Sequence, residues 1–75
     1  MEAWVIKRDD GKYYCGWEFG KYCVTIEHFT KSLEKAILNK CVFYKTNAYK
    51  EIKQMDLRNC KPVKITIREE VEEDE

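Results

Sequence analysis

The stretch that decides the fold is AWVIKRDDGKYYCGWEFGKYCVTIE, residues 3–27 of a chain of 75. Asp10-Gly11 lies between two runs rich in aromatic and β-branched residues, and Gly supplies the positive φ that a tight hairpin turn requires. A two-residue turn here predicts that Arg8 faces Tyr13. Directly opposed residues of an antiparallel ladder point to the same side. The register therefore predicts one apolar face, made of Trp4, Ile6, Tyr13, Cys15 and Trp17.

Phe19-Gly20 offers a second turn of the same length. It pairs Trp17 with Tyr22 and adds further residues to the same apolar face: Tyr22, Val24 and Ile26. A slip of one residue would turn the whole apolar set to the solvent side, so the agreement of the two turns favours this register. Phe is unfavourable at a turn position with positive φ, and a longer loop across residues 17–21 is the alternative.

The rest of the chain predicts two helices. Thr30 is a suitable N-cap for a short helix over the apolar spacing of residues 29–37. Residues 46–57 predict the longer helix, because apolar side chains recur there at i, i+4 and i+7. These side chains belong to Ala48, Ile52 and Met55. Arg58-Asn59 then ends the helix, and Pro62 prevents its resumption.

Two more strands complete the prediction. Residues 40–44 are largely β-branched or aromatic, and residues 63–68 alternate apolar with polar side chains, with Pro62 suited to the first position of that strand. The fold class is therefore α+β, with a mostly antiparallel sheet that begins in a three-stranded meander. The order is β-β-β, short helix, β, helix, β, with the helices on one face. A five-stranded nucleic-acid-binding barrel has a similar order, but the long helix before the last strand does not fit it.

Charge divides the chain into a basic body and an acidic tail. Residues 1–68 carry fourteen basic and eight acidic residues, a net charge of +6, and six acids lie within residues 69–75. We expect residues 1–68 to form one small domain and residues 69–75 to be a disordered tail. The chain contains neither a signal-peptide pattern nor an apolar run long enough to span a membrane. These absences predict a cytoplasmic protein that makes no membrane contact.

Four cysteines and one histidine are the residues with reactive or metal-binding side chains that we considered. No C-x-x-C pair is present, and without a secretory segment reduced thiols are expected. A zinc site of four converging thiolates is the alternative that spacing alone leaves open. His28 has no sequence partner beyond Glu27, and no catalytic or phosphate-binding motif occurs. The sequence predicts no catalytic, cofactor-binding or metal-binding residue, and no enzyme.

The opening WVIKRDDGKYY, residues 4–14, resembles the start of small phage and prophage proteins of unknown function. Phe29-Thr30 with Leu33 and Ala36, followed by a strand, a helix and a closing strand, is similar to the rest of their pattern. The resemblance implies a bacterial or viral cytosolic setting. It assigns no catalytic residue.

Two functions follow from these observations. The first is a non-enzymatic protein-interaction module, in which a phage or prophage accessory protein acts on a host protein or pairs with a second copy through a sheet edge. The second is a small nucleic-acid-binding module, in which exposed tyrosines stack on bases and lysines contact phosphates. The residues predicted for a partner or nucleic-acid surface are Lys7, Lys12, Tyr14, Tyr44 and Tyr49.

Overall fold

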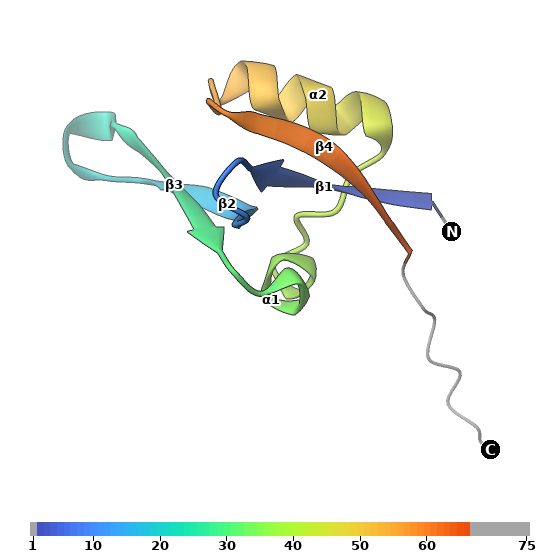
Figure 1. The fold of residues 1–75 in the computed structure, drawn as a ribbon. Coiled ribbons are helices and arrows are strands. Elements are labelled where there is room, and N and C mark those ends of the chain that lie inside the picture. The colour runs from blue at the N-terminus through green and yellow to red at the C-terminus, as the bar shows by residue number, and fades with distance from the viewer. Residues whose placement is uncertain (1, 67–75) are drawn as a thin grey trace.

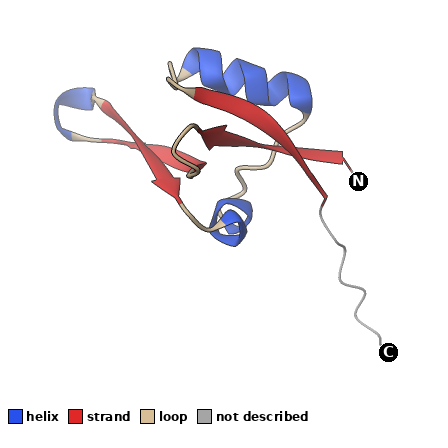
Figure 2. Ribbon diagram, in the orientation of Figure 1, coloured by secondary structure: helices blue, strands red, loops and turns tan. Residues whose placement is uncertain are grey.

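The computed structural model describes residues 2–66. Its elements are β1 (Glu2–Arg8), β2 (Tyr13–Phe19), β3 (Thr25–Thr30), α1 (Leu33–Leu38), α2 (Lys45–Gln54) and β4 (Cys60–Thr66). The strands form one antiparallel sheet in the order β3-β2-β1-β4 (Figures 1 and 2). The predicted α+β class and the three-stranded start are confirmed. The predicted tail, residues 69–75, lies outside the described residues.

The first hairpin is one residue out of the predicted register. Arg8 N donates to the Lys12 carbonyl at 2.8 Å, so the loop contains three residues, and Lys7 faces Tyr13. The expected pairing of Arg8 with Tyr13 was wrong. Gly11, with φ +90°, is the third residue of the loop, where a left-handed residue follows a standard turn. Because of this shift Tyr14, rather than Tyr13, points into the core.

Asp10 holds the loop together. Its carboxylate accepts hydrogen bonds from Arg8 Nε at 3.1 Å, Arg8 Nη2 at 2.8 Å and the Lys12 backbone N–H at 3.1 Å. The Arg8 hydrogen bonds, followed by that from Lys12, lower the pKa of Asp10 to about 2. The charged carboxylate is therefore favoured in the folded chain.

We expect Asp10→Asn to remove part of the acid sensitivity of the fold. A lowered pKa means that Asp10 stabilises the fold fully above the ordinary carboxyl pKa of 3.8 and loses this effect as the pH falls toward 2. The measurement is urea unfolding followed by circular dichroism across that pH range. Asp9→Asn is the matched control, and an Asp10→Asn chain with the wild-type pH dependence would contradict the expectation.

The second hairpin differs from its prediction more than the first does. Its turn is not Phe19-Gly20 but a longer loop around a 3-10 turn, Lys21–Cys23, and Phe19 faces Thr25. The two-residue turn was wrong because neither Phe19 nor Gly20 has a positive φ, whereas Tyr22 and Cys23 do. The apolar face assigned from it was wrong as well.

The region between β3 and α2 also departs from expectation. Residue Phe29 belongs to β3, and Ser32, not Thr30, caps α1 by accepting a hydrogen bond from the Lys35 N–H at 3.2 Å. Residues 40–44 are not a strand. Only Phe43 pairs, through two backbone hydrogen bonds with Trp4, because Lys40 has a positive φ and Tyr44 already caps α2.

The predicted long helix and closing strand are present as α2 and β4, although α2 ends at Gln54 instead of residue 57 and β4 begins at Cys60 instead of Pro62. Ala48 is fully buried, and Ile52 and Met55 pack against the core. The left-handed conformation at Asp56 and Asn59 turns the chain from α2 into β4. Pro62 is tolerated because β4 is an edge strand of the sheet.

The core lies where α2 covers β1 and the adjoining part of β2. Its buried residues are Ile6, Tyr14, Cys41, Ala48 and Leu57. The helices do not share one face as expected, because the adjacent β1 residues Val5 and Ile6 point to opposite faces of the sheet and are both fully buried. Helix α1 contacts β2 and β3, and α2 contacts β1 and β4. Figure 1 shows the strands between the two helices.

Candidate protein-interaction surface

The far half of the β2–β3 hairpin carries large aromatic side chains that the rest of the described chain leaves partly or almost fully exposed. We call this set the hairpin surface: Trp17, Phe19 and Tyr22. Val24 and Ile26 are also exposed, but Ile26 is paired with Glu18 and lies on the opposite face of the hairpin from Trp17 and Phe19. Trp17 is 42% exposed, Phe19 67% and Tyr22 93%. The rings of Trp17 and Phe19 meet edge to face with centroids 4.9 Å apart. Contiguous apolar exposure of this kind is typical of surfaces that bind other proteins.

A β-bulge determines which way Trp17 and Phe19 point. Tyr14 faces Phe29 and Trp17 faces Glu27, so two residues of β2 oppose one residue of β3 between these pairs. Without the extra residue, Tyr14 and Trp17 would point to opposite faces. With it, the face that is buried at Tyr14 and Phe29 continues, uncovered, to Trp17 and Phe19. Gly16 lies in the bulge with φ +120°, a conformation that other residues rarely adopt.

The tip of the hairpin holds two strained residues. Tyr22 and Cys23 have φ values of 62° and 60°, and both side chains are exposed. A left-handed conformation costs a residue with a side chain about 1–2 kcal/mol, and here no burial of the Tyr22 ring offsets that cost. The Gly20 N–H closes the loop by donating to the Val24 carbonyl at 2.6 Å. The tip therefore presents Tyr22 to solvent at a cost in stability.

Tyr22→Gly is expected to stabilise the isolated chain by about 0.5 kcal/mol, because glycine relieves the strain but has a more flexible unfolded state. The midpoint of urea unfolding measures this. Lys21→Gly is the matched control in the same loop, and should lower stability because Lys21 does not have a positive φ. A loss of stability in Tyr22→Gly as large as that in Lys21→Gly would contradict the expectation.

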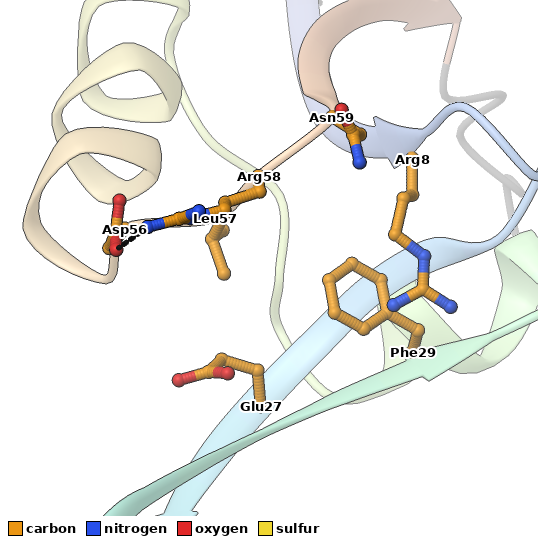
Figure 3. A pocket seen from close by; sticks show the side chains of 7 residues that line it. All are labelled: Arg8, Glu27, Phe29, Asp56, Leu57, Arg58 and Asn59. Carbon is orange, nitrogen blue, oxygen red and sulfur yellow. Dashed lines mark ion pairs between the residues drawn. The ribbon is translucent and has the colours of Figure 1, made fainter.

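A pocket lies where the hairpin joins the body (Figure 3). We call it the junction pocket: it has a volume of about 490 Å³ and is lined by Arg8, Glu27, Phe29 and residues 56–59. Figure 3 shows Leu57 and Phe29 as its apolar walls, with the Glu27 carboxylate across from Arg8. Glu27 and Phe29 lie on the same face of the hairpin as Trp17. The pocket and the exposed aromatic rings therefore form one continuous surface.

The charges around the junction pocket are balanced. The Arg8 guanidinium stacks on Phe29, 4.0 Å from the ring centroid, while it pairs with Asp10. Arg58 forms a 3.7 Å ion pair with Asp56. Glu27 accepts one hydrogen bond, from Thr25 Oγ1 at 3.3 Å, and retains capacity for another. The pocket thus offers apolar walls and a carboxylate acceptor, a combination suited to an aromatic hydroxyl group.

The five residues predicted as a partner or nucleic-acid surface do not form one surface. Tyr14 is only 1% exposed, so the expectation that it lies at the surface was wrong. Lys12 lies beside the first turn, and Lys7 lies over the Tyr13 ring at 5.5 Å, on the face of β1 opposite to the buried Ile6. Tyr44 and Tyr49 are exposed at α2.

The groups considered for chemistry are dispersed. His28 Nε2 lies 2.8 Å from Glu18 Oε2 in an exposed pair on the hairpin. Cys15, Cys23, Cys41 and Cys60 are unpaired, and burial raises the pKa of the Cys41 thiol to about 11. Within residues 2–66 no three histidine, cysteine or acidic side chains gather as metal ligands would.

Sequence reasoning named most of the hairpin surface but assigned its members to the core. Trp17 and Tyr22 were placed on the buried face together with Val24 and Ile26, and Phe19 was placed in the turn, but all five side chains are exposed. Phe19-Gly20 is the sequence feature that could have indicated this exposure. A bulky ring is unfavourable in a tight turn, so the pair favours a longer, irregular hairpin whose tip extends beyond the rest of the sheet.

No family model, no curated protein and no solved structure matches the chain. Among the described residues, the helices are all too short or too polar to cross a membrane.

Proposed function

We propose that the chain is a small, non-enzymatic protein-interaction module that binds its partner through the β2–β3 hairpin. The observation that carries this proposal is the run of exposed apolar side chains on the hairpin, which adjoins the junction pocket. The phage or prophage setting implied by the resemblance, with a host protein as target, stays a prediction.

Energetics support a role in binding. Two strands without a covering layer are marginally stable, and apolar side chains in water add nothing to the stability of the chain that carries them. The far end of the hairpin nevertheless has this arrangement and also holds a strained loop. A surface that is costly in the free chain is stabilised when a partner covers it.

The experiment compares protein capture by three immobilised chains. Wild type is expected to retain a defined protein, either a second copy of the chain that is added to the sample or a protein from a cell extract, and Trp17→Ser with Phe19→Ser to lose it. Neither side chain belongs to the buried core, since Trp17 is 42% and Phe19 67% exposed, so the double variant should keep its circular dichroism spectrum. Tyr44→Ser with Tyr49→Ser is the matched control, because it also removes two exposed rings. Equal capture by wild type and the hairpin variant would contradict the proposal.

Nucleic-acid binding is the second candidate, favoured by exposed Tyr44 and Tyr49 beside the lysines of α2. Fluorescence anisotropy with a labelled single-stranded oligonucleotide at low salt tests it. Under this alternative the Tyr44 and Tyr49 variant, not the hairpin variant, loses affinity, and affinity falls steeply as salt is added. Absence of binding at low salt would remove this candidate.

A further inference from the structure

We propose that the partner of the hairpin surface is a second copy of this chain, in a symmetric dimer where Tyr22 of each copy enters the junction pocket of the other. This inference rests on the proposed function, since it names the partner of the same surface. Two observations support the inference: Tyr22 is exposed at the tip of the hairpin, and a pocket lies at the base of the same hairpin.

The tip of the hairpin and the junction pocket match each other. Tyr22 is 93% exposed and held away from the body by its strained loop. The junction pocket, about 490 Å³ in volume, has room for an aromatic ring between Leu57 and Phe29. Its Glu27 carboxylate is available to accept a hydrogen bond from the tyrosine hydroxyl. Tip and pocket thus complement each other in shape and chemistry.

The second step is the geometry of a two-fold axis. Tyr22 lies in the loop at the tip of the hairpin, whereas Glu27 lies within β3 and lines the junction pocket at the base of the hairpin. Two hairpins packed face to face and antiparallel bring the tip of each opposite the base of the other. Trp17 and Phe19, which share a face with Glu27, then lie at the centre of the contact. In a dimer with two-fold symmetry, this contact between tip and pocket forms twice.

The charge and the contact area of the hairpin surface are compatible with self-association. Residues 17–24 contain one acid and one base, Glu18 and Lys21, and the ion-paired pocket rim is also balanced, so two copies meet without net repulsion. At about 150–250 Å² per aromatic side chain, the exposed fractions of Trp17, Phe19 and Tyr22 give about 300–500 Å² of contact area per copy. This is below the roughly 800 Å² per partner of a standard interface, so we expect a weak, reversible dimer.

Sedimentation equilibrium of the full chain, from about 1 μM to about 1 mM, measures this association. Tyr22→Ala at the tip and Glu27→Arg at the pocket are each expected to raise Kd at least about tenfold, the loss of one hydrogen-bonded aromatic anchor at each site. Tyr49→Ala, which removes another exposed tyrosine, should leave Kd within about twofold. Circular dichroism establishes that each variant is folded.

A mixture of Tyr22→Ala and Glu27→Arg is the decisive sample. The mixed dimer regains one intact contact, between the tip of the Glu27→Arg copy and the pocket of the Tyr22→Ala copy. It should therefore associate more tightly than either variant alone. A monomeric wild type, a Tyr22→Ala chain with wild-type Kd, or a mixture no tighter than its components would overturn the inference.

The two proposals fail in different ways. If wild type is monomeric but the hairpin still captures another protein, the self-association is wrong and the proposed function stands. If wild type is monomeric and the hairpin variant captures what wild type captures, both are wrong.

Discussion

Tyr14→Ala is expected to leave a large fraction of the molecules unfolded. Tyr14 is the largest fully buried side chain, and its ring packs edge to face on Phe29 with centroids 5.8 Å apart. Removing a buried aromatic ring typically costs about 3–5 kcal/mol, against a total stability of about 5–15 kcal/mol for a domain. A chain this short lies toward the lower end of that range. We expect the melting temperature to fall by at least about 12 °C.

The hydroxyl group of Tyr14 contributes a separable part of this loss. It donates a 2.8 Å hydrogen bond to Glu51 Oε2 in a partly buried setting. Burial and the neighbouring Glu51 raise the pKa of Tyr14, so the hydroxyl remains a donor and its contribution is lost only when the pH rises above the ordinary tyrosine value of 10. Tyr14→Phe should therefore cost about 1–3 kcal/mol.

Differential scanning calorimetry on Tyr14→Ala and Tyr14→Phe measures both effects. Tyr44→Ala is the matched control, because Tyr44 is 75% exposed and should change stability by less than about 0.5 kcal/mol. Equal melting temperatures for Tyr14→Ala and Tyr44→Ala would show that Tyr14 does not anchor the core.

Gly16→Val is expected to destabilise the chain by about 2–3 kcal/mol. Gly16 has φ +120° in the bulge of β2, a conformation that a β-branched residue adopts only with strain. Relief of that strain requires loss of the bulge, which would turn Trp17 and Phe19 to the opposite face of the hairpin. The substitution should therefore also abolish binding through the hairpin surface.

Glu18→Val is the control for this prediction. Glu18 is an exposed residue of the same strand, so valine is favourable there and stability should change by less than about 0.5 kcal/mol. Urea unfolding monitored by tryptophan fluorescence compares the two. If Gly16→Val unfolds at the same urea concentration as Glu18→Val, the bulge does not depend on glycine.

The elements best predicted from sequence are those whose pattern is local. The apolar spacing of Ala48, Ile52 and Met55 predicted α2, and the alternation after Pro62 predicted β4, because a period of 3.6 or 2 needs no knowledge of the partner surface. The class of the fold followed from the same patterns. The short helix began a few residues later than predicted, since Ser32 and Thr30 are both good caps and only packing selects between them.

The candidate surface was less accessible to sequence reasoning. An apolar alternation such as that of Tyr22, Val24 and Ile26 predicts a buried face, yet it carries no information on whether another element is present to cover it. Tyr13 was predicted to be buried in place of Tyr14, because a one-residue change in the length of the first turn inverts the faces of β2.

The sequence by itself determined the antiparallel α+β arrangement, the presence of the long helix and the closing strand, since these depend on periodicity and on local turn residues. Tertiary structure alone decided the register of both hairpins, the loss of the strand expected at 40–44, and the exposure of the hairpin surface. The physical reason is that register and burial are properties of pairs of segments. The bulge at Gly16 and the reach of α1 and α2 over the sheet determine which apolar side chains find a partner.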